Sequence, residues 1–429
     1  MMLIVTHVFK PLNLGTLYND KFHRYKLRLA AMKKANKLSD TDLCVMCGMC
    51  LPQCPTYQLY QTETESPRGR VALMQAINQQ KININSKALL HIDHCLGCLN
   101  CETICPSRVP YGQLIDEFRN QYNQSVRKPW LTKLILKQAA KPDGLHALTS
   151  IINKPVLKQL IKLGSTFTDL PKNTLTVEPT HLKSFYAGTY NSQEECRGEV
   201  SLFTGCIGKS SDYRSIKDAT FILNQLGFDV NIPEQQTCCG AMHQHNGQLE
   251  TAKTLLNKNR AQLEQQKSSV ILFFSPACGA SLKQAENIAI KDARTFILEA
   301  LRHQPLNFST QKQPVALHES CSHRNMLRLK TLNTELLNCI PGIQIIESSD
   351  PSLCCGAGGL QSINYPQQAQ ALLQGKLKSF DLMQTNIFIS DNIGCSLHIK
   401  TAITGYNPDI KVMHPISYLA SQLISNEKK

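Results

Sequence analysis

The hydrophobic positions in the C-terminal half of the chain form short apolar runs that alternate with longer amphipathic stretches. This pattern is typical of buried strands that alternate with helices in an α/β fold. From residue 199 onward, the runs predict one set of three strands and then a second set of three. The first set covers residues 199–203, 228–232 and 270–274, and the second covers residues 315–317, 343–346 and 387–389.

The N-terminal half shows helical periodicity instead. A helix is expected over residues 71–78, after a turn at residues 66–70. Apolar stripes with lysines on the other faces predict further helices, which either pack on their neighbours or present a membrane-surface or subunit-docking face. These stripes consist of Leu131, Leu134 and Ile135, and then of Val156, Leu157, Leu160 and Ile161.

Cysteines mark the same points in the two sets of predicted strands. Cys206, Cys238, Cys239 and Cys278 of the first set match Cys321, Cys354, Cys355 and Cys395 of the second, at offsets of 115, 116, 116 and 117 residues. So regular a repeat indicates a duplicated α/β domain. Each cysteine follows a predicted strand, where open α/β sheets place their ligand crevices, so we expect one pocket shared by the two copies.

The adjacent cysteines of each copy precede a glycine, Gly240 or Gly356, which lets the backbone pass close to whatever the thiols hold. Two thiolates on adjacent residues cannot both reach one tetrahedral ion without strain, whereas a cluster of several irons accepts them at different irons. The eight thiols are therefore candidates for a further iron-sulfur cluster, or for a docking site. Cys196 and Cys339 lie outside these sets and are expected to be structural thiols.

Two other cysteine runs precede the repeat, and both have the form C-x2-C-x2-C-x3-C-P. Thiolates three residues apart wrap a tight backbone around one iron-sulfur cubane, and in two-cluster ferredoxins the fourth cysteine reaches the other cluster. The spacing thus assigns Cys44, Cys47, Cys50 and Cys105 to one 4Fe-4S cluster, and Cys95, Cys98, Cys101 and Cys54 to a second. Zinc and disulfides are the alternatives, but zinc knuckles usually pair two C-x2-C units or add histidines.

Arg68 and Arg70 lie between the two runs. Either arginine could raise the potential of a cluster through its positive charge, although a solvated arginine is the ordinary expectation.

Composition and charge indicate the cellular compartment and the kinds of binding partner. The 429 residues include 18 cysteines, and their grouping into metal-type runs indicates a reducing compartment, the cytoplasm. No apolar run reaches the roughly 18 residues of a membrane span, so we expect a soluble or peripheral protein. Residues 1–40 and 121–185 account for +13 of the net charge of +14. The cysteine-bearing remainder is nearly neutral, which favours local basic surfaces for anionic lipid or an acidic subunit over nucleic-acid binding.

These observations predict an α+β multidomain protein, in which a helical two-cluster ferredoxin module precedes a duplicated α/β cysteine-rich domain. The expected order is a basic arm over residues 1–40, the ferredoxin domain over 41–120, and a basic helical connector and linker over 121–198. The two cysteine-rich copies follow over residues 199–310 and 311–429.

The combination of motifs resembles the iron-sulfur subunit of glycolate oxidase (glycolate dehydrogenase), a relative of the heterodisulfide reductase and anaerobic glycerol-3-phosphate dehydrogenase iron-sulfur subunits. The resemblance covers residues 40–425. It rests on both C-x2-C-x2-C-x3-C-P runs, on Pro67-Arg68-Gly69-Arg70, on the two Cys-Cys-Gly (CCG) motifs, on Cys278-Gly279-Ala280 and on Asn392-Ile393-Gly394-Cys395.

The resemblance implies that partner FAD-binding dehydrogenase subunits oxidise glycolate to glyoxylate, and that this chain passes the electrons toward quinone, with peripheral contact to the inner face of the cytoplasmic membrane. No dinucleotide-binding G-x-G-x-x-G follows a predicted strand here, which agrees with substrate oxidation on another chain. The alternatives are a heterodisulfide reductase-like subunit that reduces a disulfide or quinone at its CCG domains, and the iron-sulfur subunit of a D-lactate or glycerol-3-phosphate dehydrogenase.

The chain departs from the heterodisulfide reductase pattern at the end of each copy. That family's CCG domain ends in C-x2-C, whereas the residue three positions before Cys278 is Ser275 and the residue three positions before Cys395 is Asn392. Each copy is thus one cysteine short. Four histidines are candidates to replace a thiolate, as in Rieske-type ligation, or are ordinary surface or core histidines: His318 and His323 beside Cys321, and His243 and His245 after the first CCG motif.

Overall fold

The computed structural model describes residues 37–122, 128–152, 187–192, 194–285, 288–403 and 405–424. The basic arm expected over residues 1–40 lies almost wholly outside the described residues. So do the predicted stripe at residues 156–161 and most of the expected linker. None of the described helices is long and apolar enough to cross a membrane.

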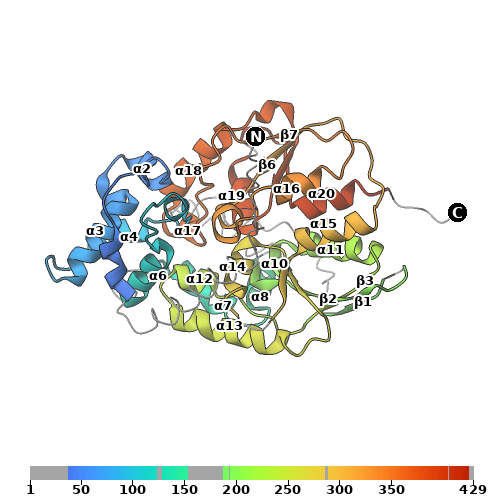
Figure 1. Ribbon diagram of the computed structural model, residues 1–429, viewed down its shortest axis with the longest axis horizontal. Coiled ribbons are helices and arrows are strands. Elements are labelled where there is room, and N and C mark those ends of the chain that lie inside the picture. The colour runs from blue at the N-terminus through green and yellow to red at the C-terminus, as the bar shows by residue number, and fades with distance from the viewer. Residues whose placement is uncertain are drawn as a thin grey trace, which may run out of the picture.

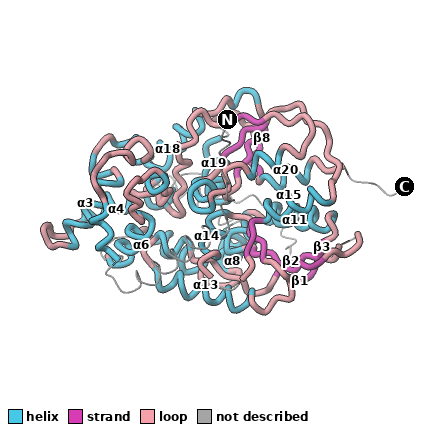
Figure 2. Tube along the Cα trace, viewed as in Figure 1, coloured by secondary structure: helices cyan, strands magenta, loops and turns pink. Residues whose placement is uncertain are grey.

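The N-terminal module consists of short helices without strands among its described residues (Figure 2). Its elements are η1 (Lys37–Leu43), α2 (Pro55–Tyr60), η2 (Glu63–Glu65), α3 (Pro67–Asn78), α4 (Ser86–Asp93), α5 (Asn100–Thr103) and α6 (Tyr111–Gln121). Helix α3 begins earlier than expected because Ser66 caps it by accepting a hydrogen bond from the Gly69 amide at 2.9 Å, with Pro67 in the first turn. Met74, Leu114 and Phe118 are fully buried in the core of this module.

Two helices connect this module to the first sheet, namely α7 (Trp130–Ala139) and α8 (Gly144–Ile152). Their apolar faces are covered, since Ala139 and Leu145 share a core cluster with Phe203 and Cys238. For the described part of the connector, packing on neighbours is therefore confirmed.

The first sheet has the strand order β1-β3-β2-β4-β5. Its elements are β1 (Gly188–Tyr190), β2 (Gly198–Phe203), α10 (Gly205–Ser211), α11 (Tyr213–Gln225), β3 (Phe228–Ile232), α12 (Ala241–His245), α13 (Leu249–Leu263), β4 (Ile271–Phe273), α14 (Pro276–Leu282), β5 (Ile290–Asp292) and α15 (Ala293–His303). All pairs are parallel except the edge strand β1, which runs antiparallel to β3.

The second sheet has the order β7-β6-β8-β9, and all its pairs are parallel. Its elements are β6 (Val315–His318), the π-helical η4 (Ser322–Leu327), α16 (Leu332–Leu337), β7 (Ile345–Ile346), α17 (Gln361–Asn364), α18 (Pro366–Lys378), η5 (Leu382–Gln384), β8 (Ile387–Ser390), α19 (Ile393–Ile403), β9 (Lys411–Met413) and α20 (Pro415–Ser421). This order repeats β3-β2-β4-β5 of the first sheet, so the duplication and the α+β fold class are confirmed.

The edge strands β1, β5 and β9, each of three residues, were not predicted from the sequence. Their side chains are partly exposed, so they lack the apolar run that marks a buried strand. In Figure 1 the two sheets lie on the opposite side of the molecule from α2, α3 and α4, with α17 and α18 between. One core cluster joins the sheets, and it includes Val200, Leu317 and Leu419.

Candidate metal centres

Both ferredoxin-type runs have the same backbone turn. The second and fourth residues after the first cysteine have left-handed φ values, 55° and 84° at Met46 and Gly48, and 63° and 58° at Gly97 and Leu99. Alternating left-handed residues curl the chain tightly, so that thiols three residues apart face one centre. The spacing alone therefore produces the same thiol-presenting loop twice.

One small cavity of about 20 Å³ is lined by the thiols predicted for the second cluster: Cys54, Cys95, Cys98 and Cys101. Three of them come from the second run, on the loop before α5 and on α5 itself, while Cys54 comes from the residue before α2. All four are buried. The structure thus brings together the interlocked set that the spacing predicted, with Tyr111 donating a hydrogen bond to the Cys95 thiol at 3.6 Å.

The thiols predicted for the first cluster lie closer to the surface. Cys47 is exposed, and Cys44, Cys50 and Cys105 are half-buried. Burial raises the pKa of the Cys50 thiol, with a further contribution from the charge of Cys44. The four neighbouring apolar side chains are exposed, by 47% at Leu43, 67% at Val45, 42% at Met46 and 48% at Met49.

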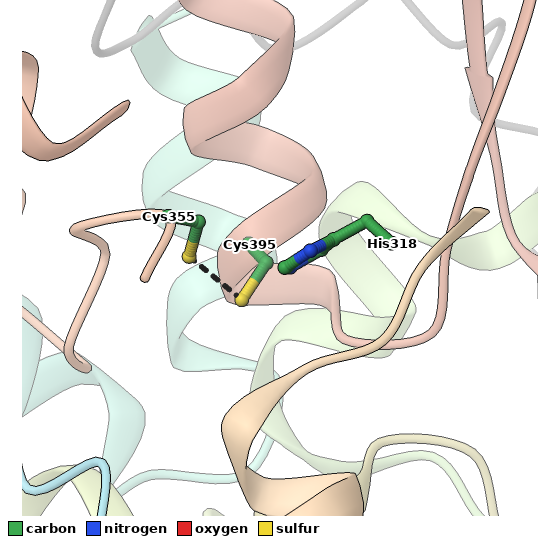
Figure 3. Close-up of side chains that lie close together, drawn as sticks. All are labelled: His318, Cys355 and Cys395. Carbon is green, nitrogen blue, oxygen red and sulfur yellow. Dashed lines mark hydrogen bonds between the residues drawn. The ribbon is translucent and has the colours of Figure 1, made fainter. Parts of the chain in front are cut away.

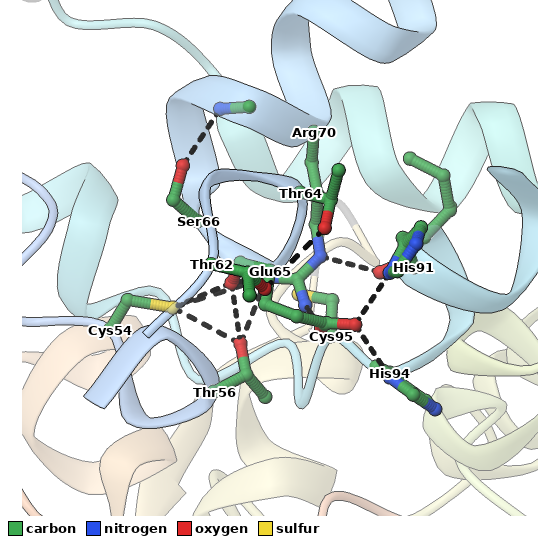
Figure 4. A network of polar contacts seen from close by, with 12 residues as sticks. Cys54, Thr56, Thr62, Thr64, Glu65, Ser66, Arg70, His91, His94 and Cys95 are labelled. Atoms are coloured by element: carbon green, nitrogen blue, oxygen red, sulfur yellow. Dashed lines mark hydrogen bonds and ion pairs between the residues drawn. The ribbon is translucent and has the colours of Figure 1, made fainter. Parts of the chain in front are cut away.

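Arg70 is buried, although a solvated arginine was the ordinary expectation. It is 1% exposed and lines the second-cluster cavity. Its Nη1 lies 3.9 Å from the Cys54 Sγ and donates to the Thr56 hydroxyl at 3.0 Å (Figure 4). Burial becomes tolerable because Nη2 forms an ion pair of 2.5 Å with Glu65 Oε2 and Nε donates to the His91 carbonyl at 2.7 Å. Arg68 lies nearer the surface, where it bonds Glu63 and the Met46 carbonyl.

The carboxylate that pairs with Arg70 was not predicted from the sequence. Glu65 Oε1 contacts the Nδ1 atoms of His91 and His94 at 2.7 and 2.8 Å, so three side chains surround one buried carboxylate (Figure 4). Burial opposes its charge, but His94 and Arg70 outweigh that effect and lower the pKa of Glu65. No local spacing pattern indicates this network, since its members come from η2, α3 and the end of α4.

A larger cavity of about 140 Å³ lies between the two copies of the repeat, and all eight of their cysteines line it, so the expectation of a shared pocket is confirmed. Cys206 and Cys321 follow β2 and β6, Cys278 and Cys395 follow β4 and β8, and the adjacent pairs follow β3 and β7. Parallel strands bring these positions to one edge of each sheet. Cys196 and Cys339 are not among the residues that line the cavity.

The glycine of each CCG motif is required by close backbone packing. Gly240 has φ 95°, and a Cβ there would lie 2.8 Å from the Ala252 carbonyl oxygen. Gly356 has φ 80°, and its Cβ would lie 2.4 Å from the Ala369 carbonyl oxygen. Only glycine combines a left-handed backbone with this approach, which aims the paired thiols at the cavity.

Within each copy, the four thiols contact one another in series. In the second copy the Cys355 Sγ lies 2.9 Å from the Cys395 Sγ. Hydrogen bonds from Cys321 and Cys355 lower the pKa of Cys354, and hydrogen bonds from Cys238 and Cys278 lower the pKa of Cys239. Such a row of thiols offers several sulfur donors at one place, the arrangement that soft metal ions and iron-sulfur clusters bind.

The structure separates the four candidate histidines. His318 is buried beside Cys355 and Cys395, and one of its ring nitrogens and the two sulfurs lie within 4.8 Å of one another (Figure 3). Burial, and then the charge of Lys376, lowers the pKa of His318 to about 3, so its imidazole is neutral. His323 Nδ1 instead lies 3.1 Å from Asp391, and His243 Nε2 lies 3.1 Å from the Leu136 carbonyl. His245 lines the cavity wall, 3.4 Å from Asp116.

The second ferredoxin-type run docks directly onto the second copy of the repeat. Asn325 donates to the Cys98 carbonyl at 2.7 Å, and Asn100 donates to the Ser352 carbonyl at 2.9 Å. Cys98 and Cys354 belong to one buried cluster, and burial together with the nearby charge of Cys354 raises the pKa of Cys98. The small cavity and the cysteines of the second copy are therefore neighbours.

Comparison with protein-family models agrees with this architecture. Residues 40–109 match the model described as a 4Fe-4S dicluster domain, and residues 200–283 and 315–400 each match the CCG cysteine-rich domain. A solved structure of a hypothetical protein from Helicobacter pylori aligns over 95% of this chain and 76% of its own, with a TM-score of 0.52 and 11% sequence identity, which supports the fold alone.

Two curated relatives are similar over most of their length. The probable glycolate oxidase iron-sulfur subunit of Bacillus subtilis is 28% identical over 86% of this chain and 91% of its own. The glycolate oxidase iron-sulfur subunit of Escherichia coli is 26% identical over 84% of this chain and 89% of its own. The chain thus belongs to the CCG-domain iron-sulfur proteins, with a 4Fe-4S dicluster domain before two cysteine-rich domains, and it resembles the iron-sulfur subunits of glycolate oxidase.

Proposed function

We propose that this chain is the electron-transfer subunit of a flavin-dependent 2-hydroxy acid dehydrogenase, and that the substrate of this dehydrogenase complex is glycolate. A partner flavoprotein would oxidise glycolate to glyoxylate, and this chain would carry the electrons toward quinone. The similarity to two glycolate oxidase iron-sulfur subunits supports this function. The observation that carries it is the order of the thiol sets, from the surface at Cys47 to the interior at Cys98 and Cys354.

The two thiol sets of the N-terminal module suit different positions in such a relay. The first set lies at a surface rich in exposed apolar side chains, as partner interfaces often do, and we assign electron entry from the flavoprotein to this face. The second set is buried against the second CCG domain, so electrons would leave in that direction. When bound, 4Fe-4S clusters supply one-electron steps between a two-electron flavin donor and an acceptor.

The direct test is anaerobic reduction by substrate. The chain, purified in complex with its co-expressed flavoprotein, should lose visible iron-sulfur absorbance and gain the EPR signals of reduced clusters on addition of glycolate. D-lactate and glycerol 3-phosphate serve as matched controls for the alternative dehydrogenases. Reduction by either of them and not by glycolate would assign a different substrate, and no reduction by any of the three would refute the dehydrogenase proposal.

A second candidate function is reduction of a disulfide or quinone at the CCG domains themselves. The observation that favours it is access, since Cys206, Cys278 and Cys321 line the shared cavity and are only half-buried. The test mixes dithionite-reduced protein with either a disulfide or a short-chain quinone. Only an acceptor that this chain reduces will restore the absorbance spectrum of the oxidised iron-sulfur clusters.

A further inference from the structure

The two CCG domains differ at one matched position that faces their cysteines. His318 in β6 pairs with Ser390 in β8, and Phe203 in β2 pairs with Phe273 in β4. Ser390 and Phe273 each stand five positions before the fourth cysteine of their copy, which is Cys395 or Cys278. His318 and Phe203 each stand three positions before the first cysteine of their copy, which is Cys321 or Cys206. The register therefore makes His318 the counterpart of Phe203, and Ser390 the counterpart of Phe273.

The second domain therefore has two polar side chains, His318 and Ser390, at the positions where the first domain has two buried phenylalanine rings. Both ring nitrogens of His318 and the Ser390 hydroxyl are buried without a hydrogen-bond partner among the described residues. A buried polar group without a hydrogen-bond partner destabilises the folded state by about 1–3 kcal/mol. A polar side chain buried beside thiols is therefore expected to have a bound partner, such as a metal centre. The His318 imidazole lies next to the thiols of Cys355 and Cys395, where a shared metal centre could bind (Figure 3).

The two domains also differ in charge at a matched position near the adjacent cysteines. Lys376 in α18 is 2% exposed; burial lowers its pKa to about 8, and the nearby charges of Cys354 and Cys355 act in the opposite direction. Its counterpart in α13 is the neutral Asn259, seven residues after Ala252 as Lys376 is seven residues after Ala369; both alanines pack on the glycine of their CCG motif. A buried cation favours several thiolates at one place, and only the second domain has it at this position.

The donor set also indicates the class of centre. Four thiols and one imidazole exceed the four ligands of a tetrahedral ion, and the adjacent Cys354 and Cys355 cannot both reach one ion without strain. A centre with several irons accommodates them, and imidazole is an established ligand of iron in such centres.

We propose that the second CCG domain holds an iron-sulfur centre in which the His318 imidazole is a ligand beside the Cys355 and Cys395 thiolates. The first CCG domain, with Phe203 at the matching position, provides no such ligand. The inference goes beyond the proposed function, because it concerns a third centre. It can be tested in the isolated chain, so a failure of glycolate-driven reduction leaves it standing, and its own failure leaves the two ferredoxin-type clusters in place.

The experiment measures iron, zinc and acid-labile sulfide in the anaerobically reconstituted full chain, together with pulsed EPR of the reduced protein labelled with 15N-histidine. The ferredoxin-type runs alone would bind about eight irons. The wild type should contain more than that and show strong coupling to a histidine nitrogen. The double variant His318→Phe/Ser390→Phe, which imports the aromatic pair of the first domain, should lose the iron of the third centre relative to the wild type, and should also lose the coupling.

Two further variants keep the test decisive. His318→Cys should retain the iron of the third centre and lose only the nitrogen coupling, which matters if the double variant fails to fold. His243→Asn removes a buried histidine from the first domain and should change neither readout. The proposal is refuted if the wild type holds only about eight irons, if zinc replaces iron in the second domain, or if the coupling persists without His318.

Discussion

Arg70 offers a test of how this protein sets the potential of its second ferredoxin-type site. The perturbation is Arg70→Met, which removes a buried positive charge whose Nη1 lies 3.9 Å from the Cys54 Sγ. Reduction adds negative charge to a cluster at that site, so the arginine stabilises the reduced state. Its loss should lower the reduction potential of that cluster and leave the more exposed first site nearly unchanged.

The expected size follows from Coulomb's law. A sulfur-iron bond adds about 2.3 Å, which places the guanidinium roughly 6 Å from the nearest iron. At an effective dielectric constant of about 20, one unit charge at that distance contributes about 2.8 kcal/mol, or about 120 mV for one electron. Because the added electron is shared among several irons, we expect a decrease of about 60–120 mV.

The assay is an EPR-monitored redox titration of the reconstituted chain. Glu65→Gln is the matched control with the opposite sign, because it removes the negative partner of the same ion pair, whose Nη2 to Oε2 distance is 2.5 Å. Arg70→Lys keeps the charge and should stay much closer to the wild type. A decrease of less than about 20 mV in Arg70→Met, with iron content unchanged, would refute the electrostatic role of Arg70.

Three other predictions follow from the structure. Arg294→Met should destabilise the holoprotein by about 3–5 kcal/mol in thermal unfolding, because it leaves Asp391 and Asp292 buried without their cation, whereas the exposed Arg302→Met should cost under about 1 kcal/mol. Burial raises the pKa of Asp212 to about 7, so the folded state binds the proton more tightly than the unfolded chain, and this contribution to stability is lost as pH rises from about 4 to 7. Asp212→Asn should therefore raise the unfolding midpoint at pH 8, by the equivalent of about 2 kcal/mol, and much less at pH 4; an equal effect at both would contradict the assignment. Val45→Lys should reduce co-purification with the flavoprotein at least about tenfold without loss of iron, while Met383→Lys, at an 86% exposed site elsewhere, should not; equal retention by both variants would argue against entry at the first set.

The cysteine sets are the part of the protein that local spacing predicts well. Cysteines spaced three residues apart, in each of two runs, accompany the same left-handed turns at Met46 and Gly97, and offsets of 115 to 117 residues accompany two sheets with the same strand order. The buried strands were predicted for the same reason, since a strand covered on both faces is a continuous apolar run. The exposed edge strands, such as β9, carry no such run and were missed.

Other features depend on contacts between distant segments. Arg70 looked like a solvated arginine because nothing near it in the sequence indicates burial, yet Glu65 and the His91 carbonyl pair its charge in the folded protein. Likewise, His318 and His323 are equivalent as neighbours of Cys321. The fold separates them, because β6 directs His318 to the thiols while His323 faces Asp391.

The sequence by itself therefore determined the spacing of the cysteine runs and the duplicated fold, because these are encoded in short-range spacing and in a repeat. The tertiary structure decided which thiol sets are neighbours, which arginine is buried and which histidine reaches a site. These outcomes depend on packing between the second cysteine run and the second CCG domain, where Asn325 and Cys98 meet from positions more than 200 residues apart. Free energies of burial and ion pairing are set by such long-range contacts, which no local pattern contains.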